Sequence, residues 1–147
     1  MTGRENTIQF GEMNRELKFK VWDRAQRKLI TPSSITFNVN ATGRWLSFKE
    51  GCCKVHHETA ACADRYTTVE FTGLKDKNGR EIYEGDIATY QLSESTSEHD
   101  TVRFVVEWGD CGWIMQDIDL KCCVGYLTCA IKTYEVIGNI YENPELV

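Results

Sequence analysis

The chain has 147 residues, of which 41% are hydrophobic and 27% charged, and its formal net charge is −5. This length suits one domain with its own core, and the composition excludes a disordered or fibrous chain. No apolar run approaches the ~18 residues of a transmembrane helix, and the first residues lack the order of a secretory signal. We therefore expect a cytoplasmic protein without a membrane partner.

The seven cysteines form no regular disulfide pattern. Their number is odd, and two adjacent pairs occur, at Cys52-Cys53 and Cys122-Cys123. Such a pattern argues against a disulfide framework. We expect free thiols that pack as small apolar groups in a reducing compartment.

The first half of the chain alternates between apolar and polar residues in several short runs. Residues 1–12 show no such period, and we expect a flexible extension there. The alternation predicts strands over residues 17–21, 28–30, 35–39, 45–48 and 67–71. Between the last two strands, residues 54–65 are rich in Ala and Glu and predict two or three helical turns.

The run FTGLKDKNGREIYEGDIATY, residues 71–90, carries turn residues between strand-like pieces. Asp76 is placed to accept a hydrogen bond from the backbone two residues on, and Gly79 to close the turn with a positive φ. The isolated Gly85 indicates a bulge or bend before a strand at 87–92. Hairpin, bend and strand in this order predict a sheet that curls toward a barrel.

The last third of the chain continues the strand pattern. Alternation over residues 102–108 predicts a strand, and WGDCGW, residues 108–113, predicts a tight hairpin with a return strand to 118. Helical spacing then favours a helix, although Gly125 weakens it, and the residues concerned are Leu120, Val124, Leu127, Ile131 and Tyr134. A final strand is expected over residues 135–141.

These elements predict a mainly β fold, or β-rich α+β. We expect a small SH3-like barrel in the C-terminal half, with an N-terminal β sheet packed against it. Residues 13–147 would form a single domain, with an N-terminal lobe at 13–71 and a barrel-like C-terminal lobe at 72–147. Residues 1–12 lie outside it as the extension.

Three segments together resemble the YopX-like family of phage and prophage proteins. They are KFKVWD at 18–23, TGLKDKNGREIYEGDI at 72–87 and EVIGNIYENPEL at 135–146. The resemblance covers residues 13–147 and implies a phage, prophage or other mobile element as the source, hence the cytoplasm of a bacterial host. It also implies a β-rich fold that tends to self-associate, and it supplies no catalytic residue. The first 12 residues and the Cys/His-rich insert Gly51–Cys62 depart from the family.

Four aromatic residues and one acid are the candidate binding residues. SH3-like barrels commonly bind peptides with aromatic side chains beside a hairpin loop, and acidic neighbours favour basic partners. The residues are Trp113, Trp108, Tyr83, Tyr90 and Asp110. Alternation with Val106 places Trp108 in the core, whereas Trp113 lies past the turn and is the better candidate for exposure. The alternative is that both tryptophans belong to the core.

The insert CCKVHHETAAC, residues 52–62, is the candidate metal site. Cys53 and His57, four residues apart, would share a helical face, and Cys62 could join them on zinc. The spacing matches no standard zinc motif, so we favour packed thiols beside surface histidines and expect no metal or cofactor. A thiol enzyme would need an activated cysteine beside a base, and nothing in the sequence marks one.

The negative net charge disfavours nucleic acid as a partner. The first hairpin nevertheless has a basic face, formed by Lys18, Lys20, Arg24, Arg27 and Lys28. Without interleaved exposed aromatic residues we interpret it as a solvated strand face. The leading hypothesis is a non-enzymatic accessory protein that binds an unidentified host or phage protein and forms homo-oligomers. The alternatives are an SH3-like nucleic-acid-binding protein and a small zinc- or thiol-dependent enzyme.

Overall fold

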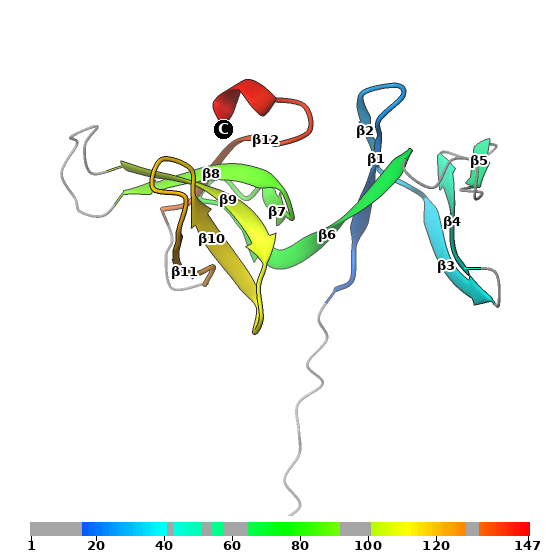
Figure 1. Cartoon of the computed structure of the whole chain (residues 1–147), viewed down its shortest axis with the longest axis horizontal. Coiled ribbons are helices and arrows are strands. Elements are labelled where there is room, and N and C mark those ends of the chain that lie inside the picture. Colours follow the sequence, from blue (N-terminus) through cyan, green and yellow to red (C-terminus); the bar gives the residue numbers. More distant parts are fainter. Residues whose placement is uncertain (1–15, 41–42, 51–53, 58–64, 92–100, 129–132) are drawn as a thin grey trace, which may run out of the picture.

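A computed structural model describes residues 16–40, 43–50, 54–57, 65–91, 101–128 and 133–147 of the chain (Figure 1). These residues form twelve strands and one 3-10 helix, η3 (Pro144–Leu146). The strands are β1 (Phe19–Asp23), β2 (Lys28–Ile30), β3 (Ser34–Asn40), β4 (Gly43–Glu50), β5 (Lys54–His57), β6 (Tyr66–Lys75), β7 (Glu81–Tyr83), β8 (Asp86–Gln91), β9 (Thr101–Trp108), β10 (Trp113–Asp117), β11 (Cys123–Tyr126) and β12 (Glu135–Asn139). The predicted mainly β fold is confirmed. Within the described ranges, no helix has the length and apolar character needed to cross a membrane.

The strands form three sheets. The first has the order β2-β1-β6-β7, the second β3-β4-β5, and the third β11-β10-β9-β8-β12. The third sheet curls into a half-barrel, and β6, ten residues long, leads from it to the N-terminal sheets (Figure 1).

A small apolar cluster joins the two N-terminal sheets. Val21 and Ile30 from the first sheet pack with Phe48 of β4, and all three are buried. The Phe48 ring also meets the edge of Tyr66 with ring centroids 5.2 Å apart. One buried aromatic side chain thus anchors the three-stranded sheet to β1 and β6.

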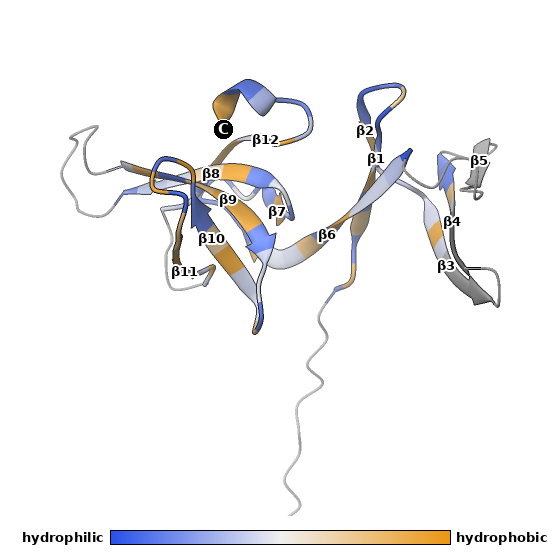
Figure 2. Ribbon diagram, in the orientation of Figure 1, coloured by the Kyte–Doolittle hydropathy of each residue, from blue (hydrophilic) through white to orange (hydrophobic). Residues whose placement is uncertain are grey.

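The largest core lies inside the half-barrel. Strands β9 and β10 supply apolar residues to it in period two (Figure 2), and β8 adds Ala88. Ile87 and Val105, which pair across β8 and β9, are also buried, so this part of the sheet is covered on its other face as well. Four residues from outside those strands complete the cluster, namely Ile82 of β7, Leu127 after β11, Tyr134 just before β12 and Val136 of β12. The first sheet therefore contributes to the same core through β7.

The turn at residues 76–79 forms as predicted. The Asp76 Oδ1 atom accepts hydrogen bonds from the backbone N–H of Asn78 at 2.8 Å and of Arg80 at 2.9 Å, and Gly79 has a φ of 81°. The other oxygen, Oδ2, accepts the backbone N–H of Val136 at 3.1 Å. The turn is thereby tied to β12, which the sequence did not indicate.

The predicted bend at Gly85 is also present. Gly85 has a φ of 77°, and an added Cβ would lie 2.8 Å from the Tyr141 ring. Both requirements favour glycine, since a side chain is strained at this φ and has no space. Asp86 follows and is buried, with Oδ2 accepting the backbone N–H of Tyr83 at 2.8 Å.

Two helix predictions are wrong. Residues 54–57 form the strand β5 instead of the start of a helix, and residues 58–64 lie outside the described residues. The helical spacing from Leu120 to Tyr134 was misleading, because Cys123–Tyr126 form β11 and pair with β10. The extension at 1–12 lies outside the described residues, and the SH3-like assignment and the lobe boundaries stay predictions.

The carboxyl group of Asp86 gives the first testable prediction. Burial raises its pKa to about 6 from an ordinary 3.8, even though the Tyr83 N–H, Arg80 and Lys20 all act to lower it. The folded state binds this proton more tightly than the unfolded state does. The protonated carboxyl therefore adds to the free energy of unfolding in full below pH 3.8, and this gain is lost as pH rises through 6. Asp86→Asn resembles the protonated form, so wild type should gain up to about 3 kcal/mol relative to D86N between pH 8 and pH 4. Urea unfolding of both proteins across this range measures it, and a constant difference would contradict the burial argument.

Candidate functional site

The hairpin joining β9 and β10 forms the candidate site. Trp108 pairs with Trp113 across the hairpin, and the Gly109 N–H donates to the Gly112 carbonyl oxygen at 2.8 Å. A Cβ on Gly109 would come within 2.8 Å of Ile114, so glycine lets Ile114 pack across the turn. The tight hairpin predicted from WGDCGW is confirmed.

The exposure of the two tryptophans is the reverse of the prediction. Trp108 is 55% exposed and Trp113 only 8%, and their rings meet edge to face with centroids 4.8 Å apart. Trp113 is covered because the chain after β11 runs beside it, where the Leu127 N–H donates to the Trp113 carbonyl at 2.8 Å. The pairing of β9 with β8 ends at Val105, opposite Ile87, so Trp108 lies beyond the part of β9 that β8 covers. Trp108, at the end of β9, therefore exposes its indole to solvent.

Tyr126 is a candidate that the sequence reasoning missed. It lies opposite Ile114 at the end of β11 and is 54% exposed. The charge of Cys111 and a hydrogen bond to its side chain raise the pKa of Tyr126. Only the pairing of β11 with β10 brings it there, so no local signal could have found it.

Two acidic residues belong to the same hairpin as Trp108. Glu107 and Asp110 are exposed, and neither forms an ion pair within the described part of the chain. We call Glu107, Trp108, Asp110, Cys111 and Tyr126 the hairpin-tip surface. It combines two exposed aromatic rings with two carboxylates.

The predicted cysteine packing is wrong where it can be followed. Cys111, Cys122 and Cys123 are free thiols, as expected, but all three are exposed. Cys111 lies in the hairpin turn, and Cys122 and Cys123 lie at the start of edge strand β11. Among the described elements, no layer covers either place.

The other two predicted aromatic residues lie elsewhere. Tyr83 of β7 is buried; its hydroxyl donates to Glu81 Oε2 at 2.8 Å, and Lys20 Nζ lies 4.0 Å from the ring centroid. Burial, followed by this hydrogen bond, raises the pKa of Tyr83. Tyr90 is half-buried near the end of β8 and lines a separate cavity. The structure thus brings Trp108, Trp113 and Asp110 together but not Tyr83 or Tyr90.

The zinc hypothesis lies largely outside the described residues. Cys53 and Cys62 belong to undescribed segments, and His57 is placed only as part of the β5 backbone. Among the residues that are described, no group of three or more His, Cys, Asp or Glu side chains could hold a metal ion. The zinc site stays a prediction.

The basic face of the first hairpin is engaged within the protein. Lys18 forms ion pairs with Glu16 and Glu81, and Lys28 forms one with Glu50. Such pairing supports the interpretation as a solvated strand face.

The fold and this hairpin define a class of mainly β proteins with a curled half-barrel sheet joined to N-terminal sheets. The family model described as "YopX protein" matches residues 18–147, and the chain belongs to the YopX family. No curated protein matches the chain.

Two solved structures share the fold. Protein EF1440 from Enterococcus faecalis is 28% identical, with a TM-score of 0.54, over 89% of this chain and 97% of that one. Protein yopX from Bacillus subtilis is 19% identical, with a TM-score of 0.56, over 88% of this chain and 96% of that one. Neither name states a ligand, a reaction or a partner. Because yopX is only 19% identical, the similarity to it shows the fold alone.

The contrast between the tryptophans gives a second prediction. Trp113→Ala should lower the free energy of unfolding by about 3–5 kcal/mol, because it empties a packed core position. Trp108→Ala should cost about 1 kcal/mol or less, because most of that indole is already in water. Denaturant unfolding of both variants measures the difference. Equal losses would contradict the exposure that defines the hairpin-tip surface.

Proposed function

We propose that the protein is a non-enzymatic accessory protein of a phage or prophage that binds another protein through its hairpin-tip surface. The observation that carries this proposal is Trp108, which is 55% exposed although its ring is held against the buried Trp113. The YopX family membership supports the phage or prophage setting, through the source that the resemblance implies.

The position of Trp108 suits an anchor for binding. An exposed indole offers a large apolar area, and tryptophan and tyrosine are enriched among the residues that dominate interface energies. Because Trp113 already restricts the Trp108 ring, the Trp108 side chain loses little rotamer entropy when a partner binds. Tyr126 adds a second exposed ring, on the opposite face of the hairpin from Trp108.

The charge around the rings favours a basic partner. Glu107 and Asp110 flank Trp108, and the whole chain carries a net charge of −5. Complementary charge chiefly raises the association rate and excludes acidic partners. The partner surface we expect therefore has an apolar pocket rimmed by Lys or Arg.

The third prediction tests this interface with matched variants. Wild type, Trp108→Ala and Leu17→Ala are immobilised, and proteins captured from lysate of the bacterial host are identified and titrated by calorimetry. Leu17 is the control, because it is exposed at 66% but lies before β1, in the N-terminal half of the chain. W108A should weaken binding of the partner by about tenfold or more, while L17A should leave the affinity unchanged.

Three further measurements separate this proposal from its rivals. Affinity of wild type should fall as salt rises, and Asp110→Asn should reduce that dependence. A partner that W108A binds as tightly as wild type does would contradict the proposed surface. Gel shifts with DNA or RNA at low salt would instead favour the nucleic-acid alternative. Homo-oligomer formation stays a prediction.

A further inference from the structure

The turn between β6 and β7 carries the chain's one Asn-Gly pair, Asn78-Gly79. Both residues are exposed, and a Cβ added to Gly79 would meet no atom within 4 Å beyond its neighbours in the chain. The Gly79 backbone nitrogen can attack the carboxamide carbon of the Asn78 side chain, because glycine has no side chain to hinder the approach. This pair is therefore the position of the chain most prone to lose a side-chain amide.

The folded turn holds the pair in a geometry that does not react. The Gly79 N–H donates to the Asp76 carbonyl oxygen at 3.0 Å, and neither Lys77 nor Asn78 has a positive φ. These features define a type I turn, in which the third residue, Asn78, has a ψ of about 0°. At this ψ the Gly79 nitrogen does not face the Asn78 side chain, and the hydrogen that must leave it is held by the Asp76 carbonyl oxygen. The closed turn therefore cannot form the five-membered ring of the intermediate.

The turn has to open before the reaction can begin. Opening breaks the Gly79 N–H bond and the 2.8 Å bond from the Asn78 N–H to Asp76 Oδ1. One hydrogen bond of typical net strength changes an equilibrium by about fivefold, so two of them reduce the open population by about thirtyfold. We expect the folded protein to lose the amide more slowly than the unfolded chain by this factor or more.

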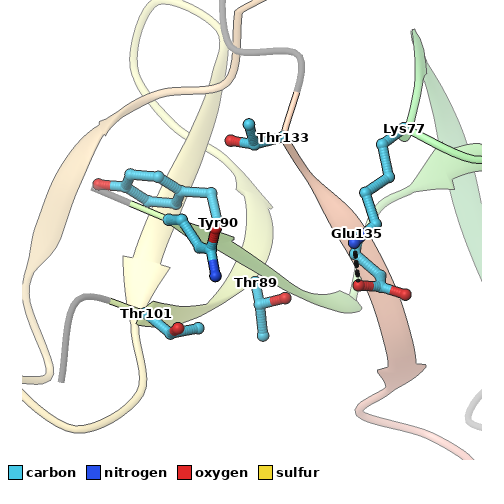
Figure 3. Close-up of a pocket in the computed structure, with 7 residues that line it drawn as sticks. Lys77, Thr89, Tyr90, Thr101, Thr133 and Glu135 are labelled. Carbon is cyan, nitrogen blue, oxygen red and sulfur yellow. Dashed lines mark ion pairs between the residues drawn. The ribbon is translucent and has the colours of Figure 1, made fainter. Parts of the chain in front are cut away.

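The same turn is connected to the edge strand β12. The Val136 N–H donates to Asp76 Oδ2 at 3.1 Å, and the Lys77 N–H donates to the Tyr134 carbonyl oxygen at 2.8 Å. Lys77 Nζ also forms an ion pair with Glu135 Oε2 at 2.5 Å (Figure 3). A change in the main chain of the turn therefore disturbs its contacts with β12.

We propose that Asn78 is a latent deamidation site, which the closed turn protects and whose conversion to isoaspartate disconnects the turn from β12. The Gly79 nitrogen loses its proton and bonds to the side-chain carbonyl carbon of Asn78, and the side-chain nitrogen leaves as ammonia. Water then breaks one of the two C–N bonds that the ring nitrogen makes to carbonyl carbons, which gives aspartate or isoaspartate. The reaction needs no oxidant or reductant.

Isoaspartate lengthens the turn, because the main chain then runs through the side-chain methylene of residue 78. The N–H groups of Gly79 and Arg80 move away from the Asp76 oxygens that accept them at 3.0 and 2.9 Å. The modified turn cannot close again, so the change runs in one direction. It does not involve the hairpin-tip surface and is independent of the proposed function.

The fourth prediction concerns the rate of this reaction, followed in the full chain by peptide mass spectrometry of residue 78 at mildly alkaline pH. Folded wild type should deamidate about thirtyfold or more slower than wild type unfolded in urea. Asp76→Ala removes the acceptor of the Asn78 N–H and should raise the folded rate about fivefold. Asp119→Ala is the control, because Asp119 is an exposed aspartate of the β10–β11 turn, and its rate should equal that of wild type.

The effect on β12 is measured on the chain that carries isoaspartate at residue 78, formed in urea and refolded. Asn78→Asp is the matched control, since it has the same charge but an ordinary main chain. The Val136 amide should exchange its hydrogen about tenfold or more faster in the isoaspartate form than in N78D.

Each outcome decides one part of the proposal. Equal rates in folded and unfolded wild type would overturn the protection, and no reaction at residue 78 in urea would overturn the site. Equal protection of the Val136 amide in the isoaspartate form and in N78D would overturn the link to β12. An isoaspartate form that fails to refold while N78D folds would support that link. Should D76A not fold, the comparison of folded with unfolded wild type decides the protection.

Discussion

The carboxylate of Asp76 joins the parts of this fold that lie far apart in the sequence. One of its oxygens holds the β6–β7 turn through the N–H groups of Asn78 and Arg80, and the other accepts the N–H of Val136, 60 residues later. Two further bonds run the same way, from the Lys77 N–H to the Tyr134 carbonyl and from Arg80 Nη1 to the Val136 carbonyl. The edge strand β12 is thereby capped by the turn. Burial acts to raise the pKa of Asp76, but the three N–H groups hold it below its ordinary value, so the group is kept as an acceptor.

The two edges of the half-barrel sheet, β12 and β11, end differently. The turn that caps β12 also carries Lys77 to Glu135. At the far edge of the sheet, β11 has no strand beyond it among the described elements, and the hairpin tip beside it extends into solvent. A rigid scaffold with its variable chemistry at loops and strand ends is the usual arrangement of a binding protein.

Local patterns predicted what local chemistry determines. The turn at Asp76–Gly79, the bend at Gly85 and the hairpin at 108–113 each carry a signal in a few consecutive residues, and all three were found from the sequence. Trp108 and Trp113 were misjudged because they are cross-strand partners on one face, so alternation treats them alike. Which of them is covered depends on where β8 begins and on the chain after β11. The spacing from Leu120 to Tyr134 failed for a similar reason, since pairing of Cys123–Tyr126 with β10 overrides helical periodicity.

The Asp76 carboxylate links the β6–β7 turn to the edge strand β12, and Asp76→Asn tests this link most directly. The carboxamide cannot accept at both ends, so one buried N–H is left without a partner. We predict that D76N unfolds with about 2–4 kcal/mol less free energy than wild type, and that the Val136 amide exchanges its hydrogen much faster. The exposed Asp110→Asn should change stability by less than about 0.5 kcal/mol. If D76N were as stable as D110N, with the Val136 amide still protected, the contact of the Asp76 carboxylate with β12 would not be what stabilises the fold.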